Sequence, residues 1–159
     1  MNHKWMLFGA VLGVAGCVSH SCELTQVNSQ CRAEHLLLQS DMLQAKLLIT
    51  QNRPQDAELA RALLQRAAAN DDSGEAQFYQ AVLLIRQQGN TADIEDLLRD
   101  AARLQHPLAI ALLAERNQAS DPEKAERYRA SYQQLDVAKS GYPSFPEALV
   151  VVRALVTPH

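Results

Sequence analysis

Four residues near the N-terminus carry side chains that bind metal ions. They are His20, Cys22, Cys31 and His35, and the last two lie one turn apart if their segment is helical. Two thiolates and two imidazoles are a suitable donor set for tetrahedral zinc. Their spacing matches no zinc-finger pattern, so metal binding is only a remote alternative. We therefore expect no metal and no other cofactor.

The remaining ionisable residues suggest helix caps rather than catalysis. Asp71-Asp72 and Glu95-Asp96 are acidic pairs, His106 precedes Pro107, and His35 suits a helix surface. Caps, turns and solvated faces account for all of them. The sequence contains no glycine-rich phosphate loop, no Gly-x-Ser-x-Gly elbow and no His-Glu-x-x-His pair. We expect no catalytic residue, no enzymatic activity and no small-molecule substrate.

The first seventeen residues have the pattern of an export signal. Lys4 precedes an apolar run over 5–14, and small residues then adjoin Cys17. That run is too short to cross a bilayer core, which needs about 20 residues. A basic start, a short apolar stretch and small residues at the cut indicate a cleaved signal. An uncleaved anchor, a buried helix, or cleavage that leaves Cys17 as a plain thiol are the alternatives.

The stretch Val14-Ala15-Gly16-Cys17 resembles the lipobox of bacterial lipoproteins. The resemblance implies a signal peptide over 1–16, acyl chains on Cys17, and a lipidated tether over 17–31. Several acyl chains make membrane attachment stable. Residue 18 is Val, whereas an Asp there usually retains such lipoproteins in the inner membrane. The implied location is therefore the periplasmic face of the outer membrane.

Acylation of Cys17 would leave an even pair of cysteines in an oxidising compartment. The resemblance thus implies a disulfide between Cys22 and Cys31. Closing so short a loop stabilises a fold by about 2–3 kcal/mol on the chain-entropy model. This bridge would pin the mature N-terminus to the first helix.

Composition favours a small helical domain that does not bind nucleic acid. Loss of Lys4 with the signal peptide lowers the net charge from -3 to -4. Nucleic-acid-binding domains instead concentrate basic residues on one face. The apolar residues are mainly Ala and Leu, which favour helices over sheets.

The first predicted helix spans about 32–51 and is apolar over a wide face. Its two stripes share helical spacing, and they consist of Leu38, Met42, Ala45 and Ile49, and of Leu36, Leu43 and Leu47. Asn52-Arg53-Pro54 ends it, because proline disfavours helix at the preceding residue.

An internal repeat of 34 residues follows. Both copies contain Leu-Leu-x-x-Ala-Ala, at 63–68 and at 97–102, and a second helix follows each copy. A weaker third copy leads to a last helix beyond the turn at 141–146. This period is typical of the tetratricopeptide class, and segments such as Arg66-Ala67-Ala68 and Gly74-Glu75-Ala76-Gln77 resemble the related Sel-like repeat. The second helices lack that family's Leu-Gly and Tyr-x-x-Gly residues.

The resemblance covers about 55–155 and implies an all-α helix–turn–helix repeat array, a superhelix of the tetratricopeptide or Sel-like kind. About three helix pairs plus an N-terminal helix would form a single domain over 32–159. A plain helical bundle is the alternative.

Helical repeat arrays leave a concave surface lined by the first helix of each pair. Exposed positions there are Arg61, Gln65, Arg99, Arg103 and Arg129, and guanidinium groups suit an acidic peptide. The last helix has too many apolar residues for one buried stripe, so it packs on both sides or forms a docking patch with Val150, Val151, Val152 and Leu155.

A lipobox, a helical repeat and no catalytic motif together predict an adapter. We expect a lipoprotein that binds a periplasmic or outer-membrane protein and helps to assemble an envelope complex, such as secretion, pilus, polysaccharide-export or cell-wall machinery. The alternative is a pilotin-like lipoprotein that escorts a secretin to the outer membrane.

Overall fold

The computed structural model describes residues 29–135, 141 and 143–157, and these are helical without any strand. This confirms the all-α prediction. Within these ranges there are seven α-helices and one 3-10 turn. In chain order they are α1 (Ser29–Gln51), η1 (Pro54–Asp56), α2 (Ala57–Ala68), α3 (Glu75–Arg86), α4 (Thr91–Arg103), α5 (Pro107–Asn117), α6 (Pro122–Gln133) and α8 (Phe145–Val156).

Helix α1 is the longest and begins three residues before the predicted start at 32. Its buried stripe is Met42, Ala45 and Ile49, which belongs to the first stripe predicted from the sequence. The helix ends where predicted, since Asn52 adopts a left-handed conformation (φ 50°) shortly before Pro54.

The two copies of the sequence repeat bury equivalent side chains. Helices α2 and α4 begin at Ala57 and Thr91, 34 residues apart. The buried equivalents are Ala60 and Ile94, Leu64 and Leu98, and Ala67 and Ala101. Both helices therefore turn the same stripe towards the core.

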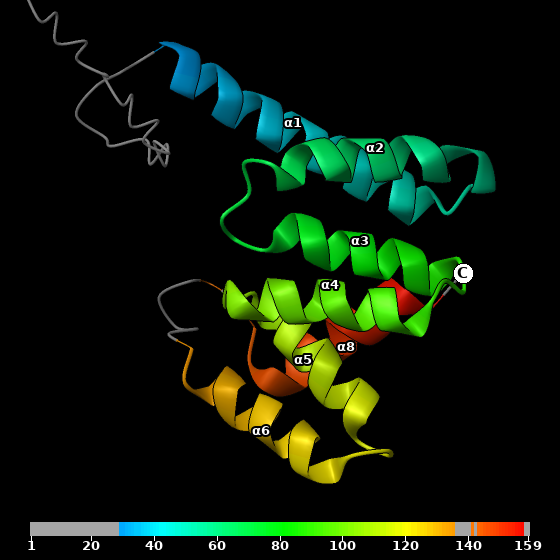
Figure 1. The fold of residues 1–159 in the computed structure, drawn as a ribbon, viewed down its shortest axis with the longest axis vertical. Helices are drawn as coiled ribbons and strands as arrows, with labels where there is room; N and C mark the ends of the chain where they lie inside the picture. Colours follow the sequence, from blue (N-terminus) through cyan, green and yellow to red (C-terminus); the bar gives the residue numbers. More distant parts are fainter. Residues whose placement is uncertain (1–28, 136–140, 142, 158–159) are drawn as a thin grey trace, which may run out of the picture.

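Successive helices pack against one another, and α8 then returns to the middle of the molecule. The closest pairs are α1 with α2, α3 with α4, and α5 with α6 (Figure 1). Helix α8 packs mainly on α5 and also contacts α3 and α6. Helix α5 is consequently surrounded, and eight of its eleven residues are buried. One continuous core runs from α1 to α8.

Arginine side chains form hydrogen bonds between helices that are distant in sequence. Arg86 on α3 donates to the backbone oxygen of Leu155 at 2.7 Å and also to that of Ile49. Both oxygens lie near helix C-termini, where a cation is favourable. Partial burial lowers the pKa of Arg86. Arg153 on α8 donates to both carboxylate oxygens of Glu115 on α5 at 2.9 Å, so α8 is bonded to both α3 and α5.

Candidate functional site

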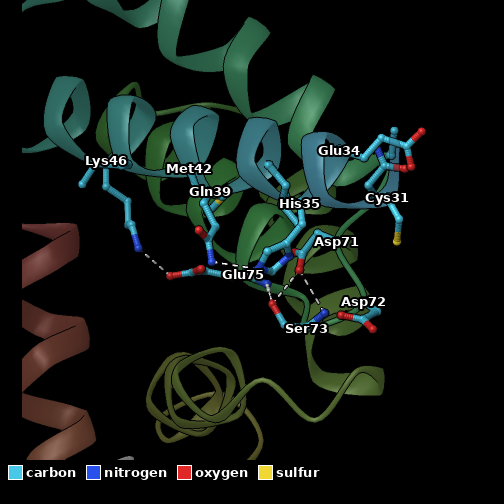
Figure 2. Close-up of a pocket in the computed structure, with 14 residues that line it drawn as sticks. Cys31, Glu34, His35, Gln39, Met42, Lys46, Asp71, Asp72, Ser73 and Glu75 are labelled. Carbon is cyan, nitrogen blue, oxygen red and sulfur yellow. Dashed lines mark hydrogen bonds and ion pairs between the residues drawn. The ribbon is translucent and has the colours of Figure 1, made fainter. Parts of the chain in front are cut away.

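A cleft of about 950 Å³ separates α1 from the loop between α2 and α3 (Figure 2). One wall consists of α1 residues from Cys31 to Lys46, and the other consists of residues 69–73 and Glu75. The N-terminal half of α1 extends beyond α2 (Figure 1), and the cleft lies beneath this overhang. It is thus built from segments about thirty residues apart in sequence.

The α1 wall combines an apolar floor with polar residues nearer the solvent. Met42 is buried and Leu38 is half-buried. At one end Lys46 Nζ pairs with Glu75 at 2.8 Å and lies 5.6 Å from the centre of the Tyr79 ring. The pair is about one third exposed on each side. Water therefore screens this ion pair, and it contributes at most about 1 kcal/mol.

The loop wall is held rigid by the side chain of Asp71. Its carboxylate accepts hydrogen bonds from Ser73 N at 2.9 Å, Ser73 Oγ at 2.6 Å and Ala76 N at 2.7 Å. The last of these satisfies a free N–H group in the first turn of α3. The N-cap residue itself is Gly74, so Asp71 acts on the start of α3 from three residues before the cap.

Gly74 closes the loop against α4. Its φ of +77° lies in the left-handed region. A Cβ atom at this position would lie 2.9 Å from both Cα and O of Ala101. Only glycine meets both requirements, so the backbone of the loop rests directly on the C-terminal turn of α4.

His106 is packed into the core next to this loop. Its ring stacks on Phe78 with 4.8 Å between centroids, and Nδ1 accepts a hydrogen bond from Ala109 N at 3.3 Å. The predicted capping role is thus confirmed. Burial lowers the pKa of His106 to about 4, although Glu75 and Asp71 favour the charged form. At neutral pH the ring is uncharged, which its acceptor role requires.

The cleft is negatively charged overall. Its carboxylates are those of Glu34, Asp71, Asp72 and Glu75, against one lysine. The imidazole of His35 lies within hydrogen-bonding distance of Gln39, at 2.9 Å, on the surface of α1. No three His, Cys, Asp or Glu side chains gather as metal ligands within the described part of the chain. This arrangement suits noncovalent binding of a segment that carries cationic and apolar side chains.

Every arginine of the predicted groove forms an ion pair with a nearby carboxylate. Each of its arginines pairs with a carboxylate three residues earlier on its own helix: Arg61 with Glu58, Arg99 with Asp96, Arg103 with Asp100, and Arg129 with Glu126. Gln65 is exposed. None of these five residues lines the cleft described above. Each arginine thus lies beside a carboxylate of its own helix, and binding of an acidic peptide to this surface stays a prediction.

The predicted patch on the last helix is divided between core and surface. Val152 is fully buried and Leu155 is half-buried, whereas Val150 is 66% exposed and Val151 is 39% exposed. We therefore remove Val152 from the docking residues, because its side chain packs into the core. Helix α8 buries one stripe and leaves a small apolar surface beside it.

The cysteines are only partly within the described residues. Cys31 lines the cleft and is disulfide-bonded. Cys17, His20 and Cys22 lie outside the described residues. Lipidation at Cys17, the pairing of Cys22 with Cys31, and the zinc alternative accordingly stay predictions.

The cleft itself was not predicted from the sequence. One signal was available: α1 is about twice as long as its neighbour α2. Two antiparallel helices of such unequal length leave an overhang, and the next loop faces it.

Among the described residues, no helix combines the length and apolar character needed to cross a bilayer. No protein-family model, curated protein or solved structure matches the chain.

Proposed function

We propose that this chain is a lipid-anchored adapter of the bacterial envelope that binds a partner protein in the cleft between α1 and the α2–α3 loop. Acyl chains on Cys17 hold it at the periplasmic face of the outer membrane. The observation that carries the binding proposal is the cleft, which is open, apolar at its floor and acidic at its walls. We also propose that α2–α3 and α4–α5 are two copies of a tetratricopeptide-like helix pair. Their 34-residue offset and equivalent buried positions support this.

The charges of the cleft select the chemistry of the partner. Asp72 is exposed, and the pair of Glu75 with Lys46 leaves the net charge of the cleft negative. A segment with Lys or Arg next to a Leu- or Met-sized side chain would place its charge at the walls and its apolar group over Leu38 and Met42. This differs from the acidic peptide that the arginines suggested.

Site-specific photo-crosslinking tests partner binding. A photoreactive amino acid replaces Gln39, which is exposed and lines the cleft, or Gln118, which is exposed at the turn after α5. We expect a discrete protein adduct from Gln39 in intact envelopes, its loss on adding Asp72→Lys, and no such adduct from Gln118. Equal adducts from both positions, or none from Gln39, would contradict the proposed site.

The membrane anchor is tested separately by metabolic labelling. Cells that produce the protein are grown with an alkyne fatty acid. The labelled protein should then appear in the outer-membrane fraction. The Cys17→Ser variant should be unlabelled. Unlabelled wild-type protein that leaves the cell envelope on osmotic shock would refute the anchor without bearing on the cleft.

A further inference from the structure

The face of α1 that points away from the domain is unusually apolar. Leu36, Leu43 and Leu47 lie on one side of the helix and are 56%, 63% and 49% exposed, and Leu37 beside them is 61% exposed. Leu43 also borders the cleft, so the edge of this face adjoins the cleft. The spacings of seven and four residues align these side chains along the axis. The opposite stripe of α1 forms part of the core, so this helix has two apolar faces and the domain covers one.

The charges around this exposed face are compatible with an anionic surface. The carboxylates of α1 within 31–51 are Glu34 and Asp41. Neither lies three, four or seven residues from Leu36, Leu43 or Leu47, whereas Leu37 is three residues from Glu34 and four from Asp41. Glu34 lines the cleft, and Asp41 is buried against Arg66. The flanking positions instead hold Arg32, Gln39, Ser40 and Gln44, together with Lys46, whose charge is paired with Glu75. Apolar residues flanked by basic and neutral polar ones are typical of helices that lie in a membrane interface.

The chain length before α1 keeps this face near the membrane. Cys17 and Ser29 are twelve residues apart in sequence, which is at most about 42 Å of extended chain. Cys31 is disulfide-bonded. With Cys22 as its partner, five residues and the bridge would join the acylated Cys17 to α1, at most about 23 Å.

We propose that the exposed leucine face of α1, formed by Leu36, Leu43 and Leu47, lies in the interface of an anionic phospholipid bilayer. This inference rests on the acyl anchor of the proposed function. A second copy is a poorer fit, because the stripe spans less than two heptads and contains Ser40, whereas coiled coils sustain three or four. In this orientation the cleft opens beside the bilayer, at the end of α1 nearest the anchor.

Tryptophan quenching by brominated lipids tests the proposal in the lipidated protein. Trp5 is the sole tryptophan of the sequence and is lost with the signal peptide. The Leu36→Trp, Leu47→Trp and Val150→Trp variants therefore each report one site, and all three positions are exposed. The proteins are reconstituted in phosphatidylethanolamine–phosphatidylglycerol vesicles with brominated acyl chains. We expect blue-shifted, quenched emission at positions 36 and 47, and unquenched emission at 150.

The other outcomes separate the two proposals. If the protein is lipidated but its emission at positions 36 and 47 is as unquenched as at 150, membrane contact by α1 is refuted. The acyl anchor is unaffected by that result. A blue shift without quenching that grows with protein concentration assigns the face to a second copy and overturns membrane contact as well. Protein whose intact mass lacks acyl chains and that does not associate with vesicles overturns the anchor, and membrane contact with it.

Discussion

Gly74 is the residue whose replacement should disturb the cleft most directly. Replacing it by alanine has two separate costs. A residue with a side chain at φ +77° costs about 1–2 kcal/mol. The new methyl group would also lie 2.9 Å from backbone atoms of Ala101, which cannot move without displacing α4. Overpacking of this kind costs about 1–3 kcal/mol. We therefore expect Gly74→Ala to lower the free energy of unfolding by about 2–5 kcal/mol.

Gly141→Ala is the matched control. Gly141 also has a left-handed conformation, with φ +71°, but its added Cβ would have no atom within 4 Å. This variant should lose only the conformational part, about 1–2 kcal/mol. The difference between the two variants thus isolates the clash with α4.

Thermal and urea unfolding followed by circular dichroism measure both variants. For a domain of this size the loss at Gly74 corresponds to a fall of about 10 °C in Tm. Equal losses in the two variants would refute the close contact between the α2–α3 loop and α4. A Gly74→Ala protein as stable as the wild type would refute the left-handed conformation too.

Three further perturbations test other parts of the structure. Between about pH 6.5 and pH 4 the His106 imidazole is protonated in the unfolded chain but stays neutral in the folded core, because burial lowers its pKa to about 4. The free energy of unfolding should therefore fall by about 3 kcal/mol as the pH is lowered through this range. In urea titrations His106→Asn, which keeps a capping side chain, should lose this slope, and an unchanged slope would contradict it. Arg66→Ala leaves the buried carboxylate of Asp41 without its guanidinium partner, which lies 2.6 Å away. Urea unfolding should show a loss of stability in Arg66→Ala, because the Asp41 carboxylate loses its charged partner. Arg66→Lys should recover part of the loss, because lysine restores the positive charge. Cys31 in unreduced protein should resist maleimide labelling, and its reduction should cost about 2–3 kcal/mol. Rapid labelling before reduction would refute the bridge.

Local sequence signals predicted the helices well. Asn52-Arg53-Pro54 marked the end of α1, and the structure bends there. Asp121 followed by Pro122 marked the start of α6, where the Asp121 carboxylate accepts from Lys124 N at 2.9 Å. These features depend on residues within one turn of each other, so spacing alone reveals them.

The arrangement of the helices depends on contacts that spacing does not encode. In a continuing superhelix, a helix after α6 would move away from α3, whereas α8 contacts α3 and covers α5. The leucines of the second stripe on α1 read as apolar in the sequence, but only the packing shows that α2 leaves them exposed. For the same reason the sequence did not show that Arg61 and Arg103 each form an ion pair with a carboxylate of their own helix.

The central position of α5 has a consequence for the time at which the chain can fold. A helix with eight of its eleven residues buried keeps apolar side chains exposed to water until α8, which comes later in the sequence, covers it. The bonds from Arg86 to Leu155 and from Arg153 to Glu115 span 69 and 38 residues, so they form late as well. A chain exported as proposed would therefore remain loose while it is threaded through the inner membrane. It would become compact only after its last helix had crossed.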